Sequence, residues 1–484
     1  MVLGPLRRVG ARMGRPNQFQ LTNVTVDTPV IGFTGALGSG CSYLSEGLAQ
    51  HFSYAYCSLS EVIHQIARKL FNDEGTGRLQ DIGNRLREEH GRDVLVRVAL
   101  TELNKRLPKP DSPARPKGIV VDGIRNTGEV EALRQFPNFF LISVQASTGL
   151  RKSRTIGPDR KFNSEDEFLA ADARDRDEQV DDGQQVMQCN YLSDIVVLNE
   201  PQEGISPGAH GPYKDYITRI LYKPHVSLIE HVSYGRLPAE RHARPDEALM
   251  TAAYVESRRS SCLKRKVGAV IATPKGDIIS AGHNDVPETA KACIDDPRYG
   301  WCARDVIQEE LGQKLNHCPG CGTKIEIKPY SCKACGKELA DYRKRCPNQD
   351  CRAGVELSYI CPSCGSDVFR EFVPGAGPER TGRLLDMCRA LHAEENAILN
   401  LCKVGTVLPH LHANQVGLPE GCVLYSTTFP CNLCANKIVT VGIGKVVYAE
   451  PYTTAEAKRV LDQHGVKHER FQGVKSRAYF RLYG

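Results

Sequence analysis

The sequence predicts an α/β protein with two principal domains, and three observations support this prediction. Apolar runs of strand length alternate with helical stretches on both sides of a central segment, as in sheets that are covered by helices. The central segment, residues 201–212, is rich in Gly and Pro and indicates a linker. The chain has 484 residues, of which 41% are hydrophobic and 25% charged, as is typical of a soluble protein of two or three domains.

The N-terminal half, residues 28–200, predicts a parallel sheet with helices on both faces. Its first helix is expected over residues 43–52, directly after a glycine-rich turn. Helices that alternate with strands carry the chain back across the sheet, so the strands should run parallel. Residues 1–27, with four arginines and no acidic residue before Asp27, indicate a flexible tail or, alternatively, a transit peptide. The expected buried strands are residues 30–34, 118–122, 139–144 and 194–199.

The C-terminal half, residues 213–484, again mixes strands and helices. Two of its expected helices, residues 392–402 and 431–439, carry candidate functional side chains at their N-terminal ends. A helix N-terminus has a positive partial charge, which favours the thiolate form of a cysteine placed there. The other expected elements are a helix over residues 246–260 and strands over 266–272, 278–282, 422–426 and 445–448.

Two short motifs near these helix ends define a candidate metal site. His392 and Glu394 form H-x-E, and Cys431 and Cys434 belong to the P-C-x-x-C motif of residues 430–434. In this order the two motifs are the signature of zinc-dependent nucleobase deaminases. The imidazole and the two thiolates would bind a catalytic Zn²⁺ and leave its fourth position open for water, while Glu394 would move protons. A closed structural zinc site, which is the alternative, would need a fourth protein ligand.

A second group of cysteines lies in an insertion over residues 317–366. Eight of them form closely spaced pairs, which predicts a zinc-ribbon module with two structural zinc ions, each held by four thiolates. The module could act as a scaffold, form an oligomer contact or touch nucleic acid through its lysines and arginines. Cys293 and Cys302, just upstream, could extend this system or be buried thiols. The predicted ligands are Cys318, Cys321, Cys332, Cys335, Cys346, Cys351, Cys361 and Cys364.

The turn after the first expected strand keeps the spacing of a phosphate-binding loop. It follows the pattern G-x-x-x-x-G-x-S between a strand and a helix, but Cys41 replaces the lysine of that motif. Backbone amides at a helix N-terminus can still hold phosphates, whereas the positive charge needed for phosphoryl transfer is missing. We therefore predict a P-loop-like nucleotide site, with Mg²⁺ as a possible ion, rather than a kinase. The residues concerned are Gly35, Gly38, Gly40, Ser42 and Asp122.

The C-terminal half resembles the deoxycytidylate deaminase branch of the cytidine deaminase superfamily, which has an α/β/α fold. The N-terminal half resembles nucleoside-monophosphate kinases in its degenerate P-loop, in residues 122–126 and around Arg174 and Asp175. Together the halves are similar to the bacterial anti-phage dCTP deaminases, and this resemblance covers nearly the whole chain beyond residue 28. The deaminase resemblance rests on residues 259–271, 282–284, 392–396 and 427–434.

This resemblance implies that dCTP, and often dCMP, is converted to its uracil form with release of ammonia. Such a reaction would deplete a nucleotide that phage replication needs. The resemblance also implies a second nucleotide at the kinase-like half, a homo-oligomer and, in some members, an inhibitory small RNA. It further implies that Asn284 contacts the sugar or base. Arg259, Lys264 and Arg265 are candidates for phosphate contacts or, alternatively, a solvated basic face.

Composition leaves other functions open. A net charge of +6 neither requires nor excludes nucleic acid, so a nucleic-acid cytosine or adenine deaminase guided by the zinc ribbons is one alternative. A housekeeping dCMP deaminase for dTMP synthesis and a non-enzymatic nucleotide sensor are the others. The sequence has no apolar run long enough to span a membrane. Cysteine pairs in a chain without a signal peptide indicate the reducing cytoplasm.

Overall fold

The structure covers the elements of both predicted halves. The expected linker, the eight predicted ribbon cysteines and, apart from Asp27, the expected tail lie outside the described residues. No helix among the described residues is long and apolar enough to cross a membrane. The computed structural model describes residues 27–70, 76–109, 112–176, 183–200, 225–233, 242–304, 306–307, 330–331, 338–339, 388–403, 418–451 and 455–483.

The first half contains a sheet whose central strands are buried and almost entirely apolar. Its five strands from this half run parallel to one another, as the alternation of strands and helices predicts. Across the described residues the strand order is β13-β5-β4-β1-β3-β2. Four strands coincide with the predicted apolar runs, and β2 is an addition to them. The strands are β1 (Val30–Thr34), β2 (Ala55–Ser58), β3 (Ile119–Ile124), β4 (Phe139–Gln145), β5 (Ile195–Leu198) and β13 (Gly473–Val474).

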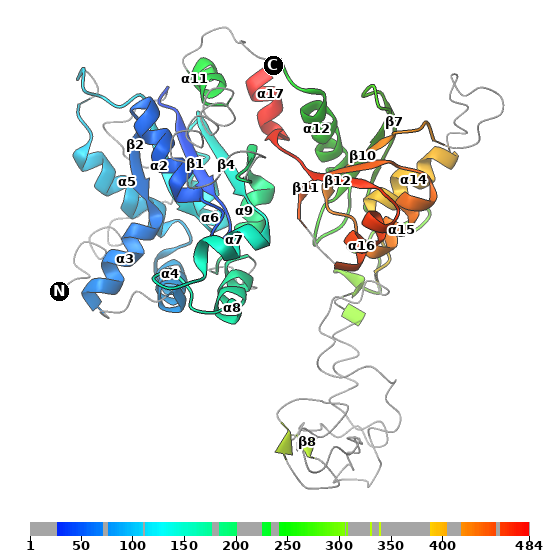
Figure 1. Ribbon diagram of the computed structural model, residues 1–484, viewed down its shortest axis with the longest axis horizontal. Coiled ribbons are helices and arrows are strands. Elements are labelled where there is room, and N and C mark those ends of the chain that lie inside the picture. The colour runs from blue at the N-terminus through cyan, green and yellow to red at the C-terminus, as the bar shows by residue number, and fades with distance from the viewer. Residues whose placement is uncertain are drawn as a thin grey trace.

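Helices cover both faces of this sheet, because neighbouring side chains of a strand point to opposite sides. On one face, Ile31 of β1 shares an apolar cluster with Leu44 of α2 (Cys41–Phe52). On the other face, Val30 shares a second cluster with Leu95 of α5 (Val94–Arg106). Figure 1 shows this sheet between its helices. The other described helices of this half are α3 (Leu59–Leu70), α4 (Thr76–His90), α6 (Thr127–Leu133), α7 (Thr148–Thr155), α8 (Glu165–Arg176) and α9 (Val186–Leu192). Helix α11 (Ser227–Ser233) lies beyond the predicted boundary but packs in the same apolar cluster as Ile31.

The second half contains a mixed sheet in the order β12-β11-β10-β6-β7. Strands β10, β11 and β12 are parallel, whereas β6 and β7 pair antiparallel with their neighbours. Helices again pack on both faces, so the α/β class is confirmed for both halves. The elements are α12 (Pro245–Ser257), β6 (Gly268–Ala272), β7 (Ile278–His283), β8 (Tyr330–Ser331), β9 (Glu338–Leu339), α14 (Ala393–Lys403), β10 (Val423–Thr428), α15 (Asn432–Thr440), β11 (Lys445–Glu450), α16 (Ala455–Gln463) and β12 (Lys467–Arg470).

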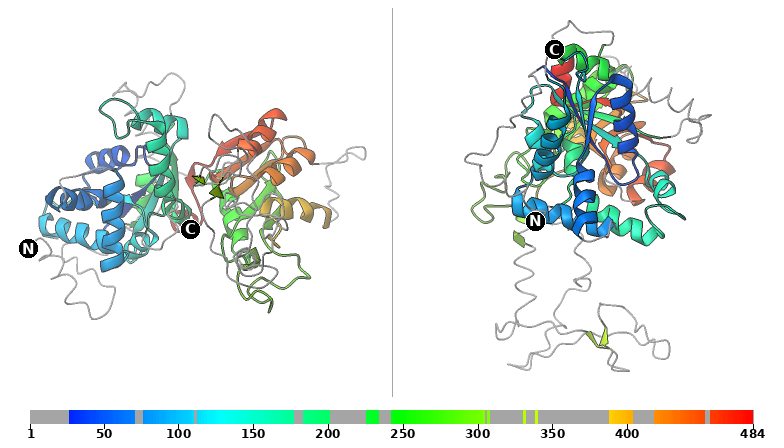
Figure 2. Two further views of the ribbon diagram at one scale, coloured as in Figure 1. Left: turned by 90° about the horizontal axis from the view of Figure 1, so that it is seen from below. Right: turned by 90° about the vertical axis from the view of Figure 1, so that its left-hand side faces the viewer.

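The end of the chain returns to the first sheet. Strand β13 pairs antiparallel with β5, and α17 (Arg477–Tyr483) follows it. Ala478 and Leu482 of α17 lie in the same apolar cluster as strands of the first sheet, and the Arg481 guanidinium lies over the Phe140 ring. Figure 1 shows α17 between the two halves, and Figure 2 shows the two lobes side by side. The predicted boundaries place these residues in the second domain, but in space they complete the first sheet.

A shared core and a buried lysine join the two halves. Val196 of β5 lies in one apolar cluster with Leu249 of α12 and Phe471. Beside this cluster, Lys475 is 0% exposed, and its Nζ donates at 2.8 Å to the hydroxyl of Tyr254. It also donates to the backbone carbonyl oxygens of residues 190 and 191, at the end of α9. The lysine thus bridges an N-terminal helix and α12 of the second half.

We expect Lys475 to make stability depend on alkaline pH. Burial lowers the pKa of Lys475 to about 8, whereas an unfolded lysine titrates near 10.5. Between these values the unfolded chain binds more protons than the folded one, so stability rises with pH through this window. Relative to Lys475→Met, the wild-type protein should therefore gain up to about 3 kcal/mol between pH 8 and pH 10.5. Thermal unfolding midpoints of both proteins over this range measure the effect.

Taking the difference in stability between the wild type and Lys475→Met at each pH removes the contribution of the other titrating groups, which both proteins share. Lys467→Met, which removes an exposed lysine of β12, is the matched control and should show no divergence from the wild type. If the pH profiles of the wild type and Lys475→Met stay parallel from pH 8 to 10.5, Lys475 does not titrate as burial predicts.

Candidate metal centre and active site

Three side chains that can bind a metal meet at the N-terminal ends of two helices. His392 directly precedes α14, Cys431 is the N-cap residue of α15, and Cys434 lies in the first turn of α15. The ligand atoms of the three side chains all lie within 4.8 Å of one another. His392 Nδ1 lies 3.2 Å from Cys431 Sγ and 3.3 Å from Cys434 Sγ. The fold therefore brings together the three residues of the predicted ligand set.

This donor set fits Zn²⁺. Zinc takes imidazole nitrogen and thiolate sulfur, and three protein ligands leave the open position that a catalytic site needs. The hydrogen bond from Cys434 lowers the pKa of Cys431 to about 4, with a further contribution from His392, so Cys431 is poised as a thiolate. In the part of the chain that the structure describes, no other group of three His, Cys, Asp or Glu side chains lies this close together.

Glu394 is buried directly beside these ligands. Glu394 is 4% exposed, and its Oε2 lies 3.6 Å from Cys434 Sγ. Burial raises the pKa of Glu394. It lies in the first turn of α14, two residues after His392, so the helix itself fixes the carboxylate next to the metal position. A buried carboxylate with a raised pKa is suited to taking up and releasing protons.

Two side chains that the sequence motifs do not reveal support this arrangement. Ser426 of β10 is 0% exposed, and its hydroxyl donates to Glu394 Oε1 at 3.2 Å. Glu395 accepts a hydrogen bond from the Lys437 ammonium at 2.9 Å and thereby joins α14 to α15. The only sequence signal for Ser426 is its position on the strand that leads into the P-C-x-x-C motif. Both side chains hold the ligand-bearing elements in register.

Asn284 lies near the metal centre, but its side-chain amide forms hydrogen bonds with the backbone of the protein. Oδ1 accepts from the backbone N–H of Val267 at 2.7 Å, and Nδ2 donates to the backbone carbonyl of Arg265 at 2.8 Å. The next residue, Asp285, forms a backbone bridge with Leu391, which precedes the metal-binding histidine. Asn284 thus fixes the segment before β6 close to the ligands. A contact between Asn284 and the sugar or base remains a prediction.

The three candidate phosphate-binding side chains have protein partners. Arg265 donates to Glu450 at 2.7 Å, and Arg259 pairs at 2.8 Å with a glutamate one turn earlier on the exposed surface. The Lys264 ammonium lies 5.9 Å from the centre of the Trp301 ring. Among the three, Arg265 is anchored most firmly, since Asn284 also holds its backbone. Their roles toward a phosphate remain predictions.

A separate small pocket gathers cysteines that the sequence pattern does not pair. Four thiols from distant segments line it, together with Asp285 and Arg304. No three of their sulfur atoms lie within 4.8 Å of one another, so they do not form a compact metal-binding group. In the sequence only Cys293 and Cys302 lie close together, and the fold brings Cys262 and Cys388 to the same pocket. The four are Cys262, Cys293, Cys302 and Cys388.

The glycine turn of the first half lies between β1 and α2, and its role as a nucleotide site stays a prediction. Gly38 and Gly40 have φ of +77° and +85°, which residues other than glycine rarely adopt. Ser42 Oγ donates to Asp122 Oδ2 at 2.7 Å, so the structure brings together the serine of the turn and the carboxylate of β3. Burial, aided by Asp122, raises the pKa of the Cys41 thiol well above its usual value. Cys41 is therefore neutral and does not replace the missing lysine charge.

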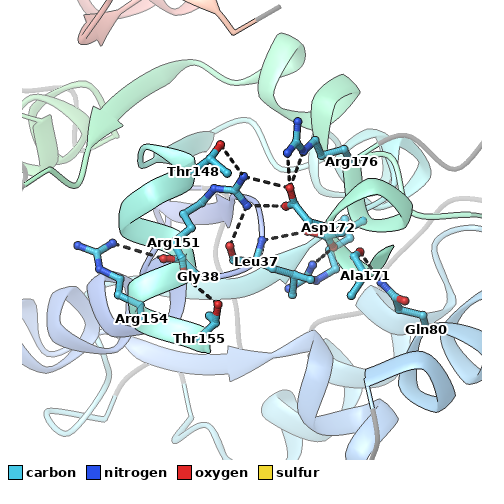
Figure 3. Close-up of polar contacts among 12 residues, drawn as sticks. Leu37, Gly38, Gln80, Thr148, Arg151, Arg154, Thr155, Ala171, Asp172 and Arg176 are labelled. Carbon is cyan, nitrogen blue, oxygen red and sulfur yellow. Dashed lines mark hydrogen bonds and ion pairs between the residues drawn. The ribbon is translucent and has the colours of Figure 1, made fainter. Parts of the chain in front are cut away.

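Arginines hold this turn from outside. Figure 3 shows Arg151 directed toward Asp172 and Leu37, and Arg154 beside Gly38. Arg151 Nη1 donates to the backbone carbonyl of Leu37 at 3.0 Å, and its Nη2 donates to Asp172 at 3.1 Å. Arg154 donates to the backbone carbonyl of Ser39 at 3.2 Å. These side chains therefore fix the shape of the turn through its carbonyl oxygens.

Comparison with known proteins agrees with the metal centre. Residues 243–450 match the family model described as the cytidine and deoxycytidylate deaminase zinc-binding region. This range includes all three metal-binding side chains and Glu394. Residues 243–450 are therefore similar to the zinc-binding region of the cytidine and deoxycytidylate deaminases.

Individual relatives cover parts of the chain. A probable deoxycytidylate deaminase of Drosophila melanogaster is 37% identical over 114 residues, which are 22% of this chain and 50% of the relative. The deoxycytidylate deaminase of Schizosaccharomyces pombe is 26% identical over 235 residues, or 48% of this chain and 44% of the relative. The chain thus spans about half the length of these two relatives. A UPF0200 protein of Methanococcus maripaludis is 26% identical over 191 residues, or 39% of this chain and 91% of that protein.

Among solved structures, the dCMP deaminase of the cyanophage S-TIM5 in complex with dCMP and dUMP is similar to this chain. The match has 21% sequence identity and a TM-score of 0.23, and it covers 48% of this chain and 100% of the phage protein.

Proposed function

We propose that the protein hydrolyses free deoxycytidine nucleotides, converting dCMP, dCTP or both to the uracil form and ammonia. The observation that carries this proposal is the buried Glu394 carboxylate, 3.6 Å from a thiol of a three-ligand zinc site. The family match and the two deaminase relatives support cytosine on a free nucleotide as the substrate class.

The reaction consumes one water and releases one ammonia at C4 of the base. When bound, zinc lowers the pKa of a bound water toward neutrality. Glu394 accepts one water proton and delivers it to N3 of the base, and it then moves the proton of the hydroxyl formed at C4 to the departing amine. Ser426 holds the carboxylate in place by its hydrogen bond, and burial keeps the pKa of Glu394 raised, which favours its protonated form between these steps.

For the first half, the proposal is a second nucleotide site at the glycine turn. The hydrogen bond between Ser42 and Asp122 supports it, because a hydroxyl and a carboxylate so placed are suited to Mg²⁺ beside a polyphosphate. The missing lysine argues against phosphoryl transfer, so this nucleotide would regulate rather than react. By resemblance, the proposed setting is anti-phage defence through loss of dCTP, in a cytoplasmic homo-oligomer that a small RNA can inhibit.

One assay tests the deaminase proposal. The purified protein is incubated separately with dCMP, dCTP, CTP, tRNA and single-stranded DNA, and uracil products are measured by mass spectrometry. We expect products from dCMP, dCTP or both. The Glu394→Ala variant serves as the control for contaminating deaminases. Uracil in the polymers instead of the free nucleotides would favour a nucleic-acid deaminase, and no product from any substrate would favour a nucleotide sensor.

A further inference from the structure

The glycine turn is engaged by a carboxylate of the protein itself. Asp175, in the last turn of α8, accepts a hydrogen bond from the backbone N–H of Leu37 at 3.1 Å. The Asp175 side chain is 0% exposed. Backbone N–H groups of such turns are the donors that hold phosphate oxygens. A carboxylate oxygen therefore occupies a donor that a bound phosphate would use.

The same carboxylate also engages an arginine at the end of β3. Arg125 Nη1 contacts Asp175 Oδ1, and the Arg125 side chain is 24% exposed. Its backbone is fixed, because Glu129 Oε2 accepts from the backbone N–H of Arg125 at 2.8 Å. Glu129 is itself held by the buried Arg87 at 2.9 Å. The guanidinium is thus anchored next to the turn and carries the charge that Cys41 cannot supply.

Other groups at the turn are arranged for an anion. Gly40 is the N-cap residue of α2 and supplies no side-chain cap, so the positive end of this 12-residue helix faces the turn. The Ser39 hydroxyl is buried, with Ser39 1% exposed, and has no hydrogen-bond partner among the described residues. The Ser39 hydroxyl lies inside the turn, because a Cβ on Gly35 would be only 2.6 Å from it. A buried hydroxyl left unpaired is costly unless a ligand completes it.

A second buried carboxylate on α8 has a different role. Asp172 accepts from Arg151 at 3.1 Å and from Arg176 at 2.8 Å, as Figure 3 shows. Among the described residues, it accepts no hydrogen bond from the backbone N–H groups of the turn. Asp172 therefore stabilises the arginines around the turn, whereas Asp175, one helical turn later, occupies a donor of the turn itself.

We propose that Asp175 is an internal anion that a ligand phosphate displaces. The phosphate would take over the Leu37 amide and the Arg125 guanidinium, and the last turn of α8 would move away with the carboxylate. This inference rests on the proposed second nucleotide site and adds that Asp175 controls access to it. Only molecules in which Asp175 has left the turn can bind the phosphate, so the apparent affinity for the ligand is reduced by the fraction of such molecules. The site therefore responds only to abundant polyphosphate.

Calorimetry with inorganic tripolyphosphate and Mg²⁺ tests this proposal on the full-length protein. Asp175→Asn removes the competing charge while keeping the side-chain shape, and we expect it to bind tripolyphosphate about tenfold more tightly than the wild type. Asp172→Asn is the matched control, because it removes a buried carboxylate of the same helix that does not touch the turn's amides. It should show no gain in affinity. Equal affinities of Asp175→Asn and the wild type would overturn the gating role of Asp175.

A third variant separates the gate from the site. Gly40→Val places a side chain where φ is +85° and where a Cβ would lie 2.2 Å from Asn199 Nδ2, so it should abolish binding at the turn. If Gly40→Val binds tripolyphosphate as the wild type does, the proposed nucleotide site itself is wrong. Loss of binding in Gly40→Val together with no effect of Asp175→Asn would keep the site and reject the gate.

A measurement on the wild type covers the case in which Asp175→Asn does not fold. Saturating tripolyphosphate should slow amide hydrogen exchange in residues 35–44 and speed it in the last turn of α8, because that turn is released. Protection of the glycine turn without faster exchange in α8 would contradict displacement.

Discussion

Glu394→Ala is expected to abolish deamination while zinc stays bound. The carboxylate lies beside the ligand set but is not one of the three ligands, so its loss leaves the metal coordination intact. It removes the group that carries one proton of the water to N3 of the base and the other to the departing amine. Loss of one such proton carrier slows a reaction by about 10²–10⁴-fold, and Glu394 serves in more than one step. Uracil formation from dCMP and dCTP and the zinc content of the same sample are measured together.

Two further variants sharpen this test. Glu394→Gln keeps the shape and the hydrogen bond from Ser426 but cannot accept a proton, so it should be as inactive as the alanine variant. Glu420→Ala, an exposed carboxylate before β10, should keep full activity and zinc. Ammonia release by Glu394→Ala at the wild-type rate would refute the mechanism. Loss of zinc from this variant would mean that Glu394 supports the metal site as well.

The metal centre could be predicted because its geometry is local in the sequence. His392 and Glu394 are two residues apart on one helix end, and Cys431 and Cys434 are three apart on another, so each pair is placed by its own helix. Ser426 escaped prediction because only the tertiary packing of β10 against α14 brings its hydroxyl to Glu394. Nothing in a lone serine on a strand indicates which carboxylate it will meet.

The same contrast holds for the fold. The central strands are continuous apolar runs, and burial on both faces makes such runs visible in the sequence. Strand β2 mixes half-buried residues, and β13 has two residues, one of them a glycine, so neither has a periodic pattern. Strand β13 forms because α17 docks in the first core, a contact between residues more than 300 positions apart in the chain, such as Arg481 and Phe140. Sequence composition predicts a linker but contains no trace of this return.

The glycine turn shows where pattern reasoning ends. Its spacing predicted Ser42 and Asp122 as separate candidates for a nucleotide site, and their contact comes from the fold, because β1 and β3 are neighbours in a parallel sheet. The partner of the Leu37 amide, Asp175, lies 138 residues away on α8 and belongs to no phosphate-loop motif. The sequence therefore predicted the donors of the turn but not the carboxylate that engages one of them.

Cys434→Ala is expected to lose both zinc and activity. Cys434 is 0% exposed, and its sulfur lies 3.3 Å from His392 Nδ1, so no neighbouring water can easily replace it as a ligand. Two remaining protein ligands bind zinc too weakly to retain it. We therefore expect the zinc content of this site to fall from about one equivalent to nearly none. His392→Ala should behave in the same way.

Cys422→Ala provides the matched control for this last prediction. Cys422 is also 0% exposed and lies in the core beside β10, but it is not part of the ligand group. Its replacement removes a buried thiol of the same size and should cost some stability while leaving zinc and deamination in place. Zinc is measured by mass spectrometry of the metal after dialysis, as the difference from the wild type, because other sites can hold zinc. Full zinc occupancy in Cys434→Ala would reject the ligand assignment, whereas equal losses in both variants would point to unfolding rather than to ligation.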